Sequence, residues 1–228
     1  TCADVAARAA GGSLRDAGFG LVRACGPAAF ALGGGGVPPL PEVEFPAENP
    51  FSEAKRVLGK MLFFDEQLSS DNTMACATCH IPGAGGADPR LAVHPGPDGV
   101  LGTNDDMNTS PGVIRADAAN SYDPDPIFGL DAQLTGRAAN PSIMAMFADE
   151  LFWDGRATSR FEDPETGETV IASGGALESQ AVGPVLSDVE MAHADRDWVT
   201  VTAKLEEAVP MALAGDLPAD MAGRLADQ

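Results

Sequence analysis

Apolar positions repeat with helical spacing in two stretches of the chain. In the first stretch, they recur every three or four residues between 49 and 69, which predicts an amphipathic helix. Asn49 is suited to cap this helix and Pro50 to occupy its first position. The second stretch predicts a helix over 197–209 that ends before Pro210. The apolar positions of the first helix are Ala54, Val57, Leu58, Met61 and Leu62.

Other stretches carry shorter or weaker patterns. Residues 81–136 are dominated by Gly, Pro, Asp and Asn, and they predict a long loop region. Residues 140–157 predict a short helix followed by a turn, and residues 163–169 predict a hairpin-like surface turn. Strand signals are few. The pattern therefore favours a mainly α fold with long loops and little β structure.

The two ends of the chain differ from its middle. Residues 1–40 are rich in Ala and Gly, and they end in glycines and prolines that predict an extended linker. We therefore expect an N-terminal extension and linker over 1–40 and a separate domain over 41–228. Near the C-terminus, Leu217, Met221 and Leu225 share one helical face that ends without a cap. We expect the native protein to continue beyond this point.

The charge of the chain narrows the classes of partner. Its 228 residues include 14 Lys and Arg against 34 Asp and Glu, a formal net charge of −20. This charge argues against binding to nucleic acid or to anionic membrane surfaces, and it indicates an acidic extracytoplasmic surface. No run approaches the roughly 20 apolar residues of a membrane span. Because the first residue is Thr1 rather than Met, we expect a processed or trimmed N-terminus.

One motif carries the strongest chemical signal. Cys76, Cys79 and His80 have the spacing Cys-x-x-Cys-His. A zinc site would need two further ligands at suitable spacing, and a thioredoxin-like dithiol would need a preceding strand in a βαβ unit. The third chemistry is covalent haem c, in which both sulfurs form thioethers and the histidine is an axial ligand of the iron. Since a helix and a polar turn precede the motif, the sequence favours haem c.

Haem c is attached outside the cytoplasm, so the motif predicts a periplasmic or extracellular protein. That compartment is oxidising and permits disulfides. The other two cysteines, Cys2 and Cys25, are therefore expected to form a disulfide, with two small buried thiols as the alternative.

The second axial position of the iron has several candidates. His94 lies in the loop that leaves the motif and is the first candidate, and His193 is the other histidine. Methionine is the competing type of ligand. The candidate methionines are Met74, Met107, Met144, Met146 and Met191.

Three stretches of the chain have a distinctive sequence: "LGKMLFFDEQLSSDNTMACATCH" at 58–80, "FWDGRA" at 152–157 and "LESQAVGPVLSDVEMAH" at 177–193. Together they resemble the bacterial di-haem cytochrome c peroxidases, a group that includes the di-haem enzyme of methylamine utilisation. The resemblance implies a cytochrome c-like haem domain whose motif carries the peroxidatic haem. In that family a second such domain carries the electron-entry haem. This chain has one such motif, so we expect a second haem domain or subunit as its partner.

The resemblance also implies roles for individual residues. It gives Glu190 an acid/base role on peroxide, Gln180 a part in orienting peroxide or water, and Trp153 the place of an electron relay between haems. His94 resembles the removable distal ligand, in a loop of different length. The chemistry of Glu190 fits independently, because splitting peroxide requires a proton to move between its oxygens.

Two of these residues, Glu190 and Trp153, also have a simpler interpretation. Glu190 lies in an apolar "VEMA" stretch, where desolvation would raise its pKa, but a solvated glutamate at the start of a helix is the alternative. Trp153 could be an ordinary core residue, and even a relay tryptophan is expected to be packed in the core.

An acidic loop suggests a second cation. Hard oxygen ligands are closely spaced between residues 96 and 108, as Ca²⁺ requires, although the spacing is not that of an EF-hand. A solvated acidic turn is the alternative. The resembling family holds calcium through an asparagine before "FWDGRA", and Asn140 is the nearest match. The candidates in the loop are Asp98, Asn104, Asp105 and Asp106.

The leading functional hypothesis is a haem c oxidoreductase that reduces hydrogen peroxide to water. Its electrons would come from a small cytochrome or cupredoxin. The second hypothesis is an electron-transfer or assembly haem subunit without peroxide chemistry. The third is a relative that oxidises a protein side chain through high-valent iron. The sequence leaves the oligomeric state open, a homo-oligomer included.

Overall fold

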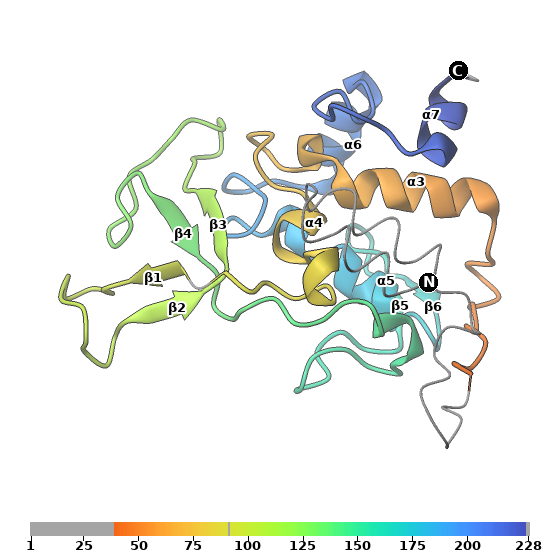
Figure 1. The fold of residues 1–228 in the computed structure, drawn as a ribbon, viewed down its shortest axis with the longest axis horizontal. Helices are drawn as coiled ribbons and strands as arrows, with labels where there is room; N and C mark the ends of the chain where they lie inside the picture. The colour runs from red at the N-terminus through yellow and green to blue at the C-terminus, as the bar shows by residue number, and fades with distance from the viewer. Residues whose placement is uncertain (1–38, 91, 227–228) are drawn as a thin grey trace, which may run out of the picture. The chain divides into compact units, whose positions relative to one another are not determined.

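The computed structural model describes residues 39–90 and 92–226 of the chain. The chain divides into two compact units, Thr1–Val43 and Glu44–Gln228, and the second unit contains all the elements discussed below (Figure 1). The expected pairing of Cys2 with Cys25 lies outside the described residues. The boundary after residue 40 stays a prediction.

The described residues form short regular elements joined by long irregular segments. The α-helices are α3 (Glu53–Phe64), α4 (Cys76–Cys79), α5 (Ala176–Ala181), α6 (Trp198–Glu207) and α7 (Ala219–Ala226). The 3₁₀ helices are η2 (Glu66–Leu68), η3 (Pro82–Ala84), η4 (Ala145–Phe147) and η5 (Pro184–Leu186). The expected long loops and small β content are confirmed. Helices are the longest elements, but loops rather than helices make up most of this part of the chain.

The strands form three antiparallel hairpins. They pair as β1 (Ala92–His94) with β2 (Met107–Thr109), β3 (Pro111–Ile114) with β4 (Ala132–Leu134), and β5 (Phe161–Glu162) with β6 (Thr169–Ile171). The turn predicted over 163–169 joins β5 to β6 and is confirmed. The other two hairpins lie within the predicted loop region 81–136. The sequence did not predict them, because strands of three or four residues are too short to show an alternating pattern.

Helix α3 begins later than its sequence predicts. Ser52 caps it, and its hydroxyl accepts a hydrogen bond from the backbone N–H of Lys55 at 3.2 Å. The predicted cap, Asn49, instead accepts from Lys55 Nζ at 2.8 Å and donates to Glu178 at 2.7 Å. The prediction of Asn49 and Pro50 as the helix start was therefore wrong, because a hydroxyl closer to the helix accepts from one of its first free N–H groups.

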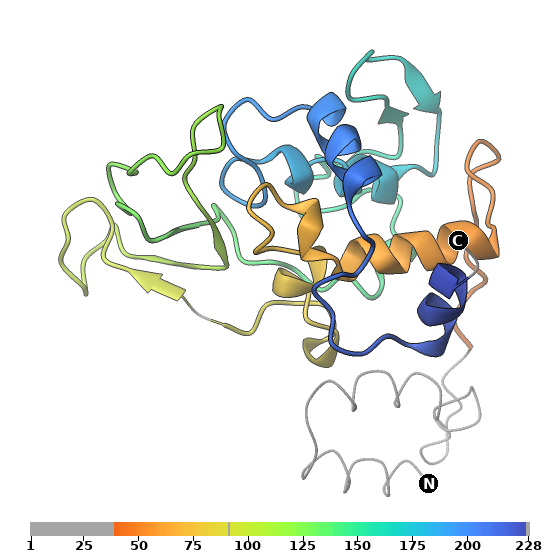
Figure 2. The same ribbon diagram turned by 90° about the horizontal axis from the view of Figure 1, so that it is seen from above.

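The buried face of α3 is narrower than predicted. Val57 and Met61 are buried against Met211 and Met221, which come from the C-terminal part of the chain. Helix α7 lies beside α3 in Figures 1 and 2. Leu58 is 56% exposed, since α7 covers one stripe of the helix, and the next residue along a helix points about 100° away from it.

A second cluster of buried side chains surrounds the cysteine motif. Val201 of α6 is fully buried in it, and Cys76 and Cys79 pack against it. The predicted helix over 197–209 is confirmed as α6, with Asp197 as its cap. The buried members are Leu68, Met74, Val113, Val185, Met191 and Val201. The motif is thus attached directly to a core built from four separate stretches of sequence.

Within residues 39–90 and 92–226, no helix is both long enough and apolar enough to cross a bilayer.

Met61→Ala is expected to lower the free energy of unfolding by about 2–5 kcal/mol, because it leaves a cavity between α3 and α7. Leu58→Ala on the same helix should change it by no more than about 0.5 kcal/mol, since that side chain is exposed. Denaturant unfolding followed by circular dichroism measures both. Equal losses in the two variants would contradict the observed face.

Candidate active site

Helix α4 consists of the cysteine motif itself. Its single turn places Cys76 and Cys79 three residues apart on one face, and both carry free thiols that are partly exposed. Thr78 Oγ1 accepts from the backbone N–H of Ala75 at 2.9 Å, which fixes the start of the turn. The backbone N–H of His80 donates to Cys76 O at 2.8 Å and closes it. Two thiols and an imidazole thus project from one hydrogen-bonded turn, as covalent haem attachment requires.

The His80 ring is oriented by two backbone carbonyls. Its Nδ1 lies 2.8 Å from Gly86 O and 3.1 Å from Asn140 O. Because both partners are acceptors, Nδ1 carries the proton, and the lone pair of Nε2 is available for a metal. The donor set therefore fits a haem iron. Asn140, which the sequence offers as a calcium ligand, contacts His80 through its backbone, and its calcium role stays a prediction.

Gly86 allows these two carbonyls to approach the ring together. It has φ of +80°, and a Cβ at this position would lie 2.2 Å from Ser142 Oγ. A side chain would therefore both strain the turn and displace the segment that carries Asn140.

An ion pair between a buried carboxylate and an exposed arginine supports the other side of the turn. The Asp88 side chain is fully buried and accepts from Arg90 Nε and Nη2, both at 2.8 Å. Arg90 holds the pKa of Asp88 below its usual range. Arg90 Nη2 also donates to Thr78 O at 2.6 Å, inside the motif. The pair therefore fixes the backbone next to Cys79.

Glu190 lies in electrostatic range of the motif. Burial raises the pKa of its carboxyl, and the positive charges of His80 and Arg156 partly oppose this rise. The same carboxylate contributes to the raised pKa of the Cys79 thiol, whose main cause is burial. The half-buried Glu190 is thus brought near His80 from a position 110 residues later in the sequence.

Trp153 is not a core residue. Its side chain is 83% exposed, so the expected packing in the core was wrong. The guanidinium of Arg137 lies 5.2 Å from the centre of its ring, and Asp154 accepts from both Arg137 and Arg156. The tight turn closed by the Leu151–Ala157 bridge presents the indole to solvent. Its role as an electron relay stays a prediction.

Gln180 lies in α5, about one turn before η5. The segment that carries Glu190 follows η5. Its side chain is half-buried, and its backbone carbonyl accepts from Gly183 N at 3.1 Å. Its part in orienting peroxide stays a prediction.

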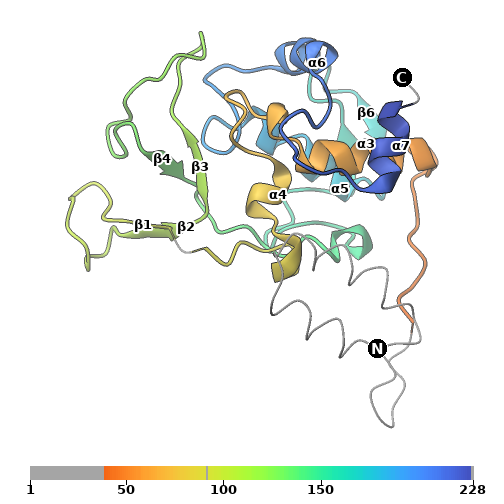
Figure 3. The same cartoon turned by 45° about the horizontal axis from the view of Figure 1, so that its top comes forward.

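His94 accepts a hydrogen bond at Nδ1, the nitrogen that carries the proton when a histidine binds haem iron through Nε2. The backbone N–H of Gly96 donates to its Nδ1 at 3.1 Å, and its ring packs against Phe128, with centroids 4.7 Å apart. An accepting Nδ1 leaves the proton on Nε2 in the neutral ring, so iron ligation through Nε2 would break this bond. The β1–β2 hairpin also projects away from α4 in Figures 1 and 3. Ligation by His94 stays a prediction.

The other candidates for the sixth ligand occupy different surroundings. Met74 and Met191 are buried in the cluster around the motif, and Met144 and Met146 are exposed near the segment that contacts His80. The backbone N–H of His193 donates to Ser70 Oγ at 2.8 Å. Met107 is half-buried on β2.

The carboxylates of the acidic loop accept hydrogen bonds from other groups of the same loop. Asp105 accepts from Asp98 N at 3.0 Å and from Thr103 Oγ1 at 2.6 Å, and Asp106 accepts from Gly102 N at 2.7 Å. Across the described part of the chain, no three His, Cys, Asp or Glu side chains converge as a metal site. Calcium binding by Asp98, Asn104 and Asp105 stays a prediction.

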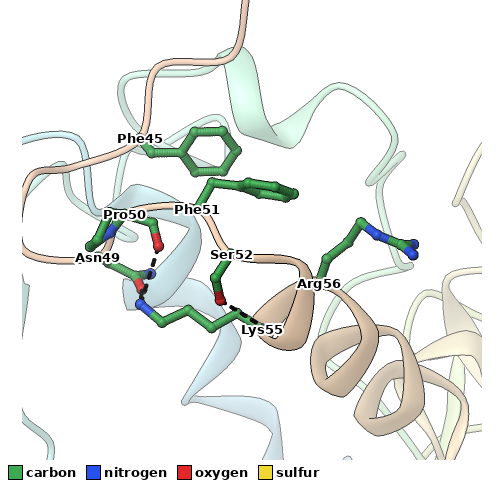
Figure 4. Close-up of a pocket in the computed structure, with 7 residues that line it drawn as sticks. All are labelled: Phe45, Asn49, Pro50, Phe51, Ser52, Lys55 and Arg56. Carbon is green, nitrogen blue, oxygen red and sulfur yellow. Dashed lines mark hydrogen bonds between the residues drawn. The ribbon is translucent and has the colours of Figure 1, made fainter. Parts of the chain in front are cut away.

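A surface hollow of about 270 Å³ lies at the start of α3, away from the motif in sequence. Figure 4 shows the rings of Phe45 and Phe51 side by side above Ser52, with Lys55 turned towards Asn49. Its lining is formed by Phe45, Asn49, Pro50, Phe51, Ser52, Lys55 and Arg56.

Comparison with known proteins identifies the family. A family model described as "Di-haem cytochrome c peroxidase" matches residues 53–213. The chain belongs to this family. The resemblance based on the three sequence stretches is thereby confirmed.

The relatives include both peroxidases and methylamine utilization proteins. Cytochrome c peroxidase Ccp of Escherichia coli (strain K12) is 30% identical over 168 residues, 73% of this chain and 24% of that protein. Methylamine utilization protein MauG of Paracoccus denitrificans is 33% identical over 163 residues, 69% of this chain and 32% of that protein. MauG of Methylophilus methylotrophus is 51% identical over 146 residues, 64% of this chain and 28% of that protein. The matched part therefore covers no more than a third of these relatives.

Sequence reasoning missed several groups around the motif. The carbonyls of Gly86 and Asn140 could not be found, because backbone acceptors have no sequence signature. Asp88 and Arg90 could have been noticed as opposite charges two residues apart, and Arg156 lies within the quoted "FWDGRA". Their contacts with the motif depend on how the loops fold around α4.

The two tryptophans of the chain should respond differently to truncation. Trp153→Ala is expected to change the free energy of unfolding by less than about 1 kcal/mol, since it removes only an exposed ring and one cation–π contact. Trp198→Ala should cost about 3–5 kcal/mol, because that ring packs against the core around the motif. Urea titrations of both variants measure this difference, and a similar loss for Trp153→Ala would refute its exposed placement.

Proposed function

We propose that this chain is the peroxide-reducing haem domain of a longer periplasmic or extracellular di-haem enzyme, with a cytochrome c-like fold. Haem c would be bound through Cys76 and Cys79, with His80 as an axial ligand. The observation that carries the proposal is the desolvated carboxyl of Glu190 in electrostatic range of a histidine whose Nδ1 is bonded to carbonyls.

The overall reaction combines one hydrogen peroxide with two electrons and two protons to give two waters. The bound haem would supply the iron at which the O–O bond accepts electrons. Glu190 would take the proton from one peroxide oxygen and deliver it to the other as the bond breaks. Burial supports this role, because it makes the carboxylate a stronger base.

The remaining groups would bring in substrate and electrons. Gln180 would orient peroxide or water, and Trp153 would pass electrons from a second haem domain. Its exposure supports this role, since an indole on the surface of this chain is available to another domain. The ultimate donor would be a small cytochrome or cupredoxin.

Glu190→Gln is expected to lower peroxide turnover by about 10²–10⁴-fold, the usual contribution of a positioned acid/base. The haem absorption spectrum should be unchanged, because the Cys-x-x-Cys-His motif is intact. Peroxide-dependent oxidation of a reduced small cytochrome by the haem-loaded protein measures this. Glu165→Gln, at the exposed turn between β5 and β6, is the matched control and should keep wild-type turnover. An active Glu190→Gln variant would remove the acid/base role.

The pH dependence of kcat/KM should show the same carboxyl. Glu190 must be ionised to accept a proton, so activity rises with pH through its pKa. Because burial raises that pKa above the ordinary value of 4.5, the rise should be centred above pH 4.5. The acidic limb should be absent from the residual activity of Glu190→Gln, and its persistence there would assign it to another group.

A second function, oxidation of a protein side chain, is favoured by the 51% identity to a methylamine utilization protein. The two functions differ in their products. A peroxidase oxidises two equivalents of a one-electron donor for each peroxide, whereas a side-chain oxidase leaves a mass change on a protein substrate. Donor stoichiometry together with intact-protein mass spectrometry distinguishes them, and stoichiometric donor oxidation without modification supports the peroxidase.

A further inference from the structure

The backbone that carries Glu190 is fixed by groups from distant parts of the chain. We define the Glu190 segment as residues 187–191. Within it, the backbone N–H of Glu190 donates to Ser187 O at 3.1 Å and to Ser187 Oγ at 3.3 Å. Met191 and Ala192 also donate to Ser187 O, at 3.0 and 2.8 Å. These local bonds shape the turn, but they do not fix its distance from the cysteine motif.

The β3–β4 hairpin binds one end of the segment. Gln133 on β4 is only 7% exposed, and its Nε2 donates to Asp188 O at 2.9 Å and to Val113 O at 3.3 Å. The backbone N–H of Val113 donates to Val189 O at 2.9 Å. Gln133 thus joins the Glu190 segment to β3 at Val113, the residue whose own backbone N–H binds the segment.

Gly112 allows the hairpin to come this close. A Cβ at this position would lie 1.8 Å from Val189 O and 3.5 Å from Glu190 Cα. Any larger residue would therefore push the Glu190 segment away from β3.

Arg196 binds the other end of the segment. It is 6% exposed, and its Nη1 donates to Leu68 O at 2.9 Å, Val185 O at 3.1 Å and Met191 O at 3.4 Å. Bonds from a buried cation to carbonyls are stronger than bonds between neutral groups. Leu68 precedes the cysteine motif, whereas Val185 and Met191 flank Glu190 on either side. One guanidinium therefore connects the backbone before the motif to the backbone around Glu190.

Ser70 reinforces this connection from the motif side. Its backbone N–H donates to Met191 O at 2.8 Å, so Met191 O accepts from both the loop before the motif and Arg196. The backbone of Glu190 is thus fixed between Asp188 O and Met191 O, each bound by a buried side chain.

We propose that Gln133 and Arg196 are positioning residues that set the distance of the Glu190 carboxyl from the haem side of the Cys76–Cys79 turn. This role rests on the proposed acid/base function of Glu190. Proton transfer depends steeply on geometry, and a displacement of about 1 Å can cost about a hundredfold in rate. Neither residue need touch the substrate, because each acts through a carbonyl next to Glu190.

The test uses haem-loaded full-length protein and removes one donor at a time. Gln133→Met keeps the length of the side chain but cannot donate. It should lower the rate constant for reaction with peroxide by between about tenfold and a hundredfold, with haem content and absorption spectrum unchanged. Gln67→Met is the matched control, because Gln67 Nε2 also donates to a backbone carbonyl, Val209 O, at 2.7 Å. It should stay within about twofold of wild type.

Arg196 is tested by conservative replacement. Arg196→Lys keeps a buried cation that can reach some of the carbonyls, and it should recover part of the rate lost in Arg196→Met. Should Arg196→Met fail to fold, Arg196→Lys and Gln133→Met still decide the proposal. Gly112→Ala provides an independent displacement of the segment and should lower the same rate.

A double variant separates positioning from general loss of structure. If Gln133 acts through Glu190, adding Gln133→Met to Glu190→Gln should change the residual rate by less than about twofold.

Two results would overturn the proposal in different ways. Wild-type rates in Gln133→Met and Arg196→Lys, with Glu190→Gln inactive, would remove the positioning role and leave the proposed function intact. Wild-type activity in Glu190→Gln would overturn the acid/base function, and the positioning role with it.

Discussion

Hydrogen bonding of buried backbone carbonyls is the constraint on which this structure depends. A chain with few long helices and only short hairpins cannot satisfy its buried backbone within regular elements. It uses buried and half-buried polar side chains instead. Arg196 binds three carbonyls, Gln133 binds two, and Lys204 Nζ donates to Ser69 O and Ser70 O. Each of these side chains joins segments that are far apart in the sequence.

The candidate site is a product of the same constraint. His80 is oriented by carbonyls of two loops, and Glu190 is carried by a backbone segment that the hairpin and Arg196 bind from either end. None of these contacts belongs to a long regular element. The positions of the side chains in such a site depend on whether its buried polar groups are all hydrogen-bonded. A buried donor or acceptor without a partner costs free energy. Loss of one bond therefore affects geometry as well as stability.

The sequence predicts the cysteine motif of this site better than the surroundings of that motif. The spacing of Cys76, Cys79 and His80 is a local pattern, and so are the periodic faces of α3 and α6. The start of α3 was misplaced because Asn49 and Ser52 are both good caps, and the choice between them depends on contacts with distant residues. The exposure of Trp153 was also missed, since burial is decided by which segments cover a side chain. Gln133 and Arg196 carry no motif, and their importance lies entirely in the carbonyls that they reach.

The pairing of α3 with α7 has a consequence for how the domain forms. Lys60 of α3 and Asp220 of α7 are ion-paired across 160 residues. Met61 of α3 is covered by Met221 of α7. Contacts of such long sequence separation form late, because the entropy of closing a large loop has to be overcome first. During synthesis, the apolar stripe of α3 is complete long before its cover exists. The nascent chain therefore exposes this apolar surface, shortly before Cys76 and Cys79 in the sequence, until α7 has been made, and exposed apolar surface of this kind favours aggregation.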